Sequence, residues 1–218
     1  MTSDRIYTRR NILRDRRGLA LIEFTLVLPV LLTLVFYGIE LANYALTRQR
    51  VSQLALLVAD NASRIGVQEV LRNRPITEAQ INDLFTGAAL QGGNIALRDR
   101  GRVILSGLTV NSSGGQWLQW QRCFGSLAFP SHYGNQGDGS SGTAFKGMGP
   151  ATNKVVASAT APLVFAELAV TYQPIISSAW APSLEISEVA SYAVRDDRDT
   201  SGAGIKNDDK APISSCSS

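Results

Sequence analysis

The longest apolar stretch lies near the start of the chain and runs from Leu19 to Ile39, where LALIEFTLVLPVLLTLVFYGI contains one charged residue, Glu23. A helix rises about 1.5 Å per residue, so this stretch covers the roughly 30 Å of a bilayer's hydrocarbon core. The pattern therefore predicts a transmembrane helix over residues 19–39. Pro29 lies inside it and cannot donate a backbone hydrogen bond to the carbonyl of Thr25, which predicts a kink.

The hydrophobic pattern changes after residue 39 but stays helical. Aromatic and branched residues recur every seven positions, at Tyr37, Tyr44, Val51, Val58 and Ile65. This spacing predicts that the helix continues to about Ile65 with one apolar face. That face could pack on the chain's own domain or against other subunits, and the pattern favours neither.

Shorter elements follow in the body of the chain. Pro75 and the sequence Thr77-Glu78-Ala79-Gln80 predict a capping box that starts a short helix ending at Gly87 or Gly92. Residues 95–110 suggest two strands around the turn Asp99-Arg100-Gly101. The strand pattern resumes at residues 117–123. The glycines of residues 125–150 predict a mobile loop.

The clearest strand lies between Pro162 and Pro174, where LVFAELAVTYQ alternates between two faces. We expect Glu167 to face solvent there. Another strand is expected over residues 186–194. A long helix laid on an antiparallel sheet is the economical assembly, so the predicted fold class is α+β. The predicted parts are a basic leader (1–18), the transmembrane segment (19–39), its helical continuation (40–66), an α+β domain (67–200) and a flexible tail (201–218).

The charge distribution argues against nucleic-acid binding and orients the membrane span. The first 18 residues hold six arginines and two aspartates, which leaves 15 basic and 16 acidic residues in the rest of the chain. The body is therefore nearly neutral and offers no basic surface to a polyanion. Arginines before the span place the N-terminus in the cytoplasm and the body outside it.

The inventory of reactive side chains is small. The chain has two cysteines, Cys123 and Cys216, and one histidine, His132, which do not meet the needs of a zinc site or a Ser-His-Asp or Cys-His centre. We therefore expect no catalytic residues, metal, cofactor or small-molecule substrate. In an exported protein the two cysteines suit one disulfide, because the bacterial periplasm is oxidising. Two unpaired thiols are the alternative.

Glu23 helps to distinguish among the possible functions of the apolar segment, which include a signal peptide and a membrane anchor. An acidic side chain within a span costs a few kcal/mol and is usually functional and paired. A secretory signal peptide would need small residues at a cleavage site, and Ala42 and Ala45 have the wrong spacing. The pair Arg9-Arg10 suggests a twin-arginine signal, but no cleavage site follows. A plain signal anchor leaves Glu23 unexplained.

A basic leader, Gly18, an apolar segment from Leu19 and Glu23 together resemble type IV pilins and pseudopilins. The resemblance implies that a prepilin peptidase cleaves between Gly18 and Leu19, which makes Glu23 the fifth mature residue. It also implies that Glu23 neutralises the N-terminal amine of a neighbouring subunit during assembly.

The body extends the likeness to one subgroup. LALIEFTLVLP lies in the N-terminal segment. The body adds Trp117-x-x-Trp120-x-Arg122-Cys123, the strand FAELAVTY and a late cysteine. Together these resemble the TadE-like minor pilins of tight-adherence pili. The resemblance implies a subunit in pilus assembly and surface attachment, with a prepilin peptidase, other pilin-like subunits and the pilus assembly machinery as partners. It also implies a single pass through the inner membrane with a periplasmic body. A signal-anchored periplasmic binding domain unrelated to pili is the alternative.

Overall fold

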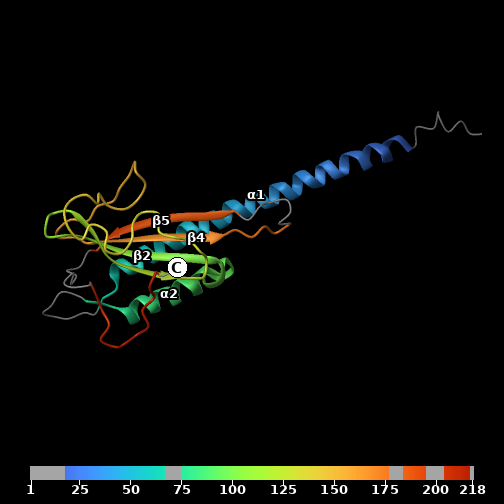
Figure 1. The fold of residues 1–218 in the computed structure, drawn as a ribbon. Coiled ribbons are helices and arrows are strands. Elements are labelled where there is room, and N and C mark those ends of the chain that lie inside the picture. Colours follow the sequence, from blue (N-terminus) through green and yellow to red (C-terminus); the bar gives the residue numbers. More distant parts are fainter. Residues whose placement is uncertain (1–17, 67–74, 177–183, 195–203, 217–218) are drawn as a thin grey trace, which may run out of the picture. The chain divides into compact units, whose positions relative to one another are not determined.

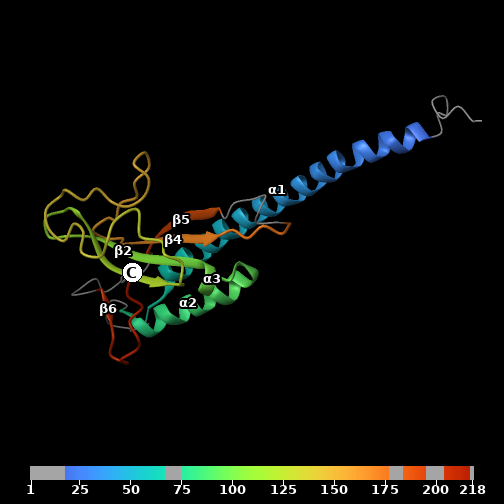
Figure 2. The ribbon, with the colours of Figure 1, turned by 45° about the vertical axis from the view of Figure 1, so that its right-hand side comes forward.

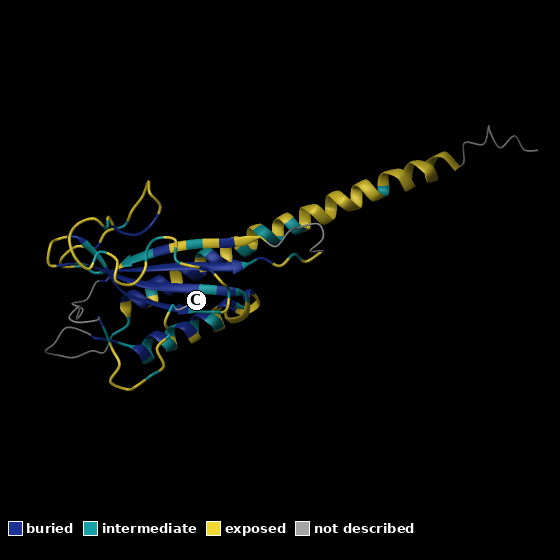
Figure 3. Ribbon diagram, in the orientation of Figure 1, coloured by how far each residue is buried: buried dark blue, intermediate teal, exposed yellow. Residues whose placement is uncertain are grey.

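A computed structural model describes residues 18–66, 75–176, 184–194 and 204–216. The chain forms two compact units, one ending at Asn43 and the other starting at Tyr44. The first unit consists of the N-terminal part of helix α1 (Leu19–Arg64), where most of the large apolar residues are exposed (Figure 3). By length and composition this helix can cross a membrane. Residues 1–17 of the predicted leader (1–18) lie outside the described residues.

The second unit contains the rest of α1, whose buried face follows helical spacing. Its buried residues are Val51, Leu54, Ala55, Val58, Ala59, Ala62 and Ser63. The predicted continuation of the helix is confirmed, and its end at Arg64 lies within one residue of the expected position. This face includes three alanines and belongs to one hydrophobic core with residues of the sheet, so the predicted apolar face packs on the chain's own domain.

The sheet has four antiparallel strands in the order β3-β2-β4-β5 (Figure 1). Their bounds are β2 (Gly101–Val110), β3 (Gln116–Phe124), β4 (Leu163–Thr171) and β5 (Glu185–Ala193). The second half of α1 and α2 (Glu78–Gly92) share one hydrophobic core with one face of this sheet (Figure 2). The predicted α+β class is confirmed.

The opposite face of the sheet is covered by chain from the segment between β3 and β4. Phe129, Met148 and Ala157 of this segment are buried against Leu108, Ile104 and their neighbours on the sheet. The central strands β2 and β4 are therefore buried on both faces. The predicted loop packs along the sheet, and Gly147 takes a positive φ of 100° where a Cβ would lie 2.3 Å from the carbonyl oxygen of Val155.

Helix α2 begins as its sequence predicts. The Thr77 side chain accepts a hydrogen bond from the Gln80 backbone, and the Gln80 side chain accepts one from the Thr77 backbone, which completes the capping box. Just before it, β1 (Ile76–Thr77) pairs in parallel with β6 (Ile205–Lys206). This small sheet holds the start of the C-terminal tail beside α2.

The two strands predicted around Asp99-Arg100-Gly101 are wrong. After η3 (Gly93–Ile95), residues 97–100 form a short helix, α3 (Leu97–Arg100), and one strand, β2, starts at Gly101. Gly101 has an extended backbone, and a Cβ there would lie 2.6 Å from Cδ1 of Leu97. The glycine therefore permits close packing on buried Leu97. It is not part of the turn between two strands that the sequence pattern predicts.

Candidate functional site

The N-terminal segment presents its predicted site residues at the start of α1. Leu19 is the first helical residue, Gly18 immediately precedes it, and Glu23 lies about one turn further along the helix. Gly18, Leu19 and Glu23 are all exposed, and so are the apolar residues around them. The carboxylate of Glu23 is thus on the surface of an apolar helix, just beyond its first turn.

The helix runs without interruption through Pro29. Two threonine hydroxyls form hydrogen bonds with backbone carbonyls of the same helix. Thr25 donates to the carbonyl of Leu21 and Thr33 donates to the carbonyl of Pro29, each at 2.7 Å. Hydroxyls bonded to the preceding turn can remain in hydrocarbon without an outside partner. The predicted kink at Pro29 remains a prediction.

The WxxWxRC pattern on β3 supplies residues to three different parts of the domain. Trp120 enters the core shared with the helices, and Trp117 is half-buried. Trp120 pairs with Gly107 on β2, where a β-bulge begins and a Cβ would lie 2.1 Å from the indole Nε1. Glycine at residue 107 therefore makes room for the indole ring.

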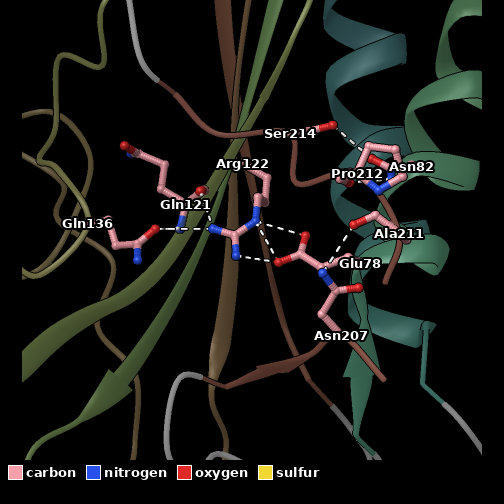
Figure 4. A network of polar contacts seen from close by, with 9 residues as sticks. All are labelled: Glu78, Asn82, Gln121, Arg122, Gln136, Asn207, Ala211, Pro212 and Ser214. Carbon is pink, nitrogen blue, oxygen red and sulfur yellow. Dashed lines mark hydrogen bonds and ion pairs between the residues drawn. The ribbon is translucent and has the colours of Figure 1, made fainter. Parts of the chain in front are cut away.

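Arg122 forms a buried ion pair with Glu78, the first residue of α2 (Figure 4). Its Nε donates to both carboxylate oxygens, at 3.1 and 2.9 Å, and its Nη2 donates to Oε1. Its Nη1 donates to the carbonyl of Gln121 and to the side chain of Gln136. This geometry satisfies both charges inside the protein and ties α2, β3 and the covering segment together.

The C-terminal tail crosses the edge of β3 at the same place. Cys123 and Cys216 are joined by a disulfide, and the Cys123 amide donates to the Ser214 carbonyl at 2.8 Å. Asn82 of α2 donates to the Pro212 carbonyl and accepts from the Ser214 hydroxyl, at 2.8 and 2.7 Å. Arg122 faces the helices while Cys123 lies on the other face of the sheet, so the tail passes around the strand edge.

The prediction that Glu167 faces solvent is wrong. Its side chain is 1% exposed on β4, beneath the segment that covers the outer face of the sheet. It accepts hydrogen bonds from the Ser131 hydroxyl and from the His132 amide at 3.0 Å. Burial raises the pKa of Glu167, and the two hydrogen bonds and the nearby His132 offset part of this rise. A period-two pattern could not show this burial, because both faces of β4 are covered.

The buried polar groups serve to hold segments together. Ser131 donates directly to Glu167, and the His132 ring packs edge-on against Phe129 at 4.6 Å between centroids. Among the described residues no group of three or more His, Cys, Asp or Glu side chains is placed to hold a metal ion. Glu167 and Ser131 hold the covering segment on the sheet, and the Cys123 amide bonded to Ser214 holds the tail there.

Comparison with known families bears on the helix that carries Gly18, Leu19 and Glu23. The family model described as "TadE-like protein" matches residues 18–66. This segment is similar to the TadE-like family. The match spans the exposed apolar part of α1 and its buried continuation, and it is consistent with a TadE-like protein of tight-adherence pili, a structural family of pilin type. No curated protein and no solved structure matches the chain.

Proposed function

We propose that this protein is a minor pilin or pseudopilin that takes part in assembling a tight-adherence pilus used in surface attachment. The observation that carries the proposal is the TadE-like match over residues 18–66, where an exposed apolar helix starts at Leu19 and presents Glu23 as its fifth residue. Residues 19–39 anchor the chain in the inner membrane by a single pass. The N-terminus is cytoplasmic and the body is periplasmic.

Processing prepares the helix for assembly. A prepilin peptidase cleaves after Gly18, which frees the amine of Leu19 at the tip of an apolar helix. In a neighbouring subunit, Glu23 offers this amine a carboxylate at a similar depth. Each group is costly in hydrocarbon when alone, so their pairing favours the packing of subunits in register. Other pilin-like subunits and the pilus assembly machinery are therefore the partners.

The N-terminal residue of the mature protein tests this proposal. We expect the full chain, produced together with a prepilin peptidase, to begin at Leu19, and to retain residues 1–18 when the peptidase is absent. Gly18→Val should block cleavage, because a branched side chain occupies the position before the scissile bond.

Gly38→Ala is the matched control. It replaces a glycine inside α1, away from the cleavage site, where a Cβ meets open space, and it should be processed like the wild type. A mature chain that keeps Met1 in the presence of the peptidase, or that starts near Ala45, would show that the segment is an ordinary anchor or a cleaved secretory signal.

A further inference from the structure

A cavity of about 530 Å³ lies between the outer face of the sheet and the segment that covers it. Ile104 and Cys123 of the sheet line it, and Leu127, Phe129 and the disulfide partner Cys216 also contribute apolar surface. Its volume lies within the roughly 300–1,000 Å³ that is common for small-molecule sites. The cavity is therefore large enough for a small organic ligand.

Of the described residues that line this cavity, one is charged, and it is Arg102. Its Nη1 donates to the Gly125 carbonyl at 2.9 Å, whereas its Nε is buried without a partner. Among the described residues it forms no ion pair. A half-buried guanidinium with unused donors is costly, and structures usually satisfy such groups. The cavity thus holds an unneutralised positive charge beside apolar walls.

The other polar side chains of the lining are largely engaged within the protein. Gln121 donates to Ser106 and to the Gly134 carbonyl, and the hydroxyls of Ser126 and Ser131 donate to the Asp99 carbonyl and to Glu167. Arg102 and the exposed side-chain amide of Asn135 are therefore the donors left for a ligand, and of the two only Arg102 carries a charge. A single cation in the described lining suits a single negative charge, and the flat guanidinium suits a carboxylate.

We propose that this cavity binds a small carboxylate with an apolar body. The carboxylate accepts hydrogen bonds from Arg102, and the apolar body packs against Leu127, Phe129 and the disulfide. Free organic acids and the carboxyl terminus of an apolar peptide share this chemistry. The cavity lies within the unit that starts at Tyr44, so ligand binding there does not depend on the pilus role.

The test measures binding to the full chain in lipid nanodiscs by ligand-observed NMR, with empty nanodiscs as the blank. One pair of probes is 3-phenylpropanoate and 3-phenylpropanamide, which differ only in charge at the head group. The second pair is acetyl-Leu-Phe and its C-terminal amide. We expect one or both acids to bind saturably. The affinity of each corresponding amide should be lower by at least about tenfold, as the loss of a charge-assisted hydrogen bond predicts.

Arg102→Gln should weaken binding of the acid to the level of its amide. Arg100→Gln removes a charge two residues away, outside the lining of the cavity, and should leave binding unchanged. Ala128→Trp places a large group at an exposed position of the lining and should block both probes of a pair. Thermal unfolding of each variant verifies that it is folded.

Three results would overturn the proposal. One is the lack of saturable binding of either acid to the wild type. Another is equal affinity for acid and amide. The third is unchanged acid binding in folded Arg102→Gln or Ala128→Trp, since the ligand would then occupy another place. Binding of the peptide acid alone would identify a chain terminus as the ligand, and binding of 3-phenylpropanoate alone would identify a free acid.

Discussion

Replacing Cys216 with serine separates the disulfide from the other contacts of the C-terminal tail. The hydrogen bonds of Pro212 and Ser214 with Asn82 do not depend on the sulfur atoms, nor does the pairing of β1 with β6. We therefore expect Cys216→Ser to fold with the tail in place. Its stability should nevertheless fall, because the unfolded chain regains the freedom of the loop that the bond had closed.

The size of the effect follows from the length of that loop. The bond joins residues 93 positions apart. In the chain-entropy relation, a loop of about this length corresponds to about 4.6 kcal/mol of the free energy of unfolding. For a domain of this size, that is a shift of roughly 9–18 °C in the melting temperature. A loss this large is comparable to a sizeable part of a typical domain's stability, about 5–15 kcal/mol.

Thermal unfolding of the full chain in nanodiscs, followed by intrinsic tryptophan fluorescence, measures the shift. Oxidised wild type should melt well above Cys216→Ser. The reductant tris(2-carboxyethyl)phosphine should lower the wild-type melting temperature to that of the variant and leave the variant unchanged. Equal melting temperatures for oxidised wild type and variant would refute the argument that loop closure stabilises this domain.

Three further substitutions test other contacts. Glu23→Gln should preserve membrane insertion and cleavage but reduce the subunit recovered in sheared pili on immunoblots, and normal recovery would contradict the pairing role. Glu78→Gln leaves Arg122 buried without its counterion and should cost about 3–5 kcal/mol in urea unfolding, whereas adding Arg122→Met should restore part of the loss. Burial raises the pKa of Glu167, so the folded protein retains that proton to higher pH than the unfolded chain, and stability falls as pH rises from the ordinary glutamate pKa through the raised one. Glu167→Gln should remove this slope, and an unchanged slope would assign the pH dependence to other groups.

Local sequence signals predicted the elements that local interactions define. The capping box at Thr77 and Gln80 forms within four residues, and the apolar face of α1 repeats over many turns. The strands β3, β4 and β5 also follow residue patterns visible along the chain. These features depend on neighbours in sequence, so the expectation and the structure agree to within one or two residues for most boundaries.

The errors arose where distant residues decide the structure. The sequence predicts a turn at Gly101, because the close contact of this glycine with Leu97 has no signature in the sequence. Glu167 was expected at the surface because alternation on β4 cannot reveal that Ser131 and His132 cover its second face.

The same reason hid the Arg122–Glu78 pair and the cavity beside Arg102. Glu78 precedes Arg122 by 44 residues, and neither residue has a local pattern that names the other. The disulfide could be anticipated only because the chain offers two cysteines, which allow one pairing.

The segment between β3 and β4 decides where a visible label can be attached to this subunit. Gly147, Met148 and Gly149 are buried against the sheet, so an insertion there would lift one of its hydrophobic layers. The turn from Pro150 to Lys154 is exposed, and the Asn153 amide donates to the Pro150 carbonyl within it. A short peptide epitope inserted in this turn leaves both cysteines and the N-terminal helix untouched, and it would allow the subunit to be followed by immunogold microscopy on intact cells.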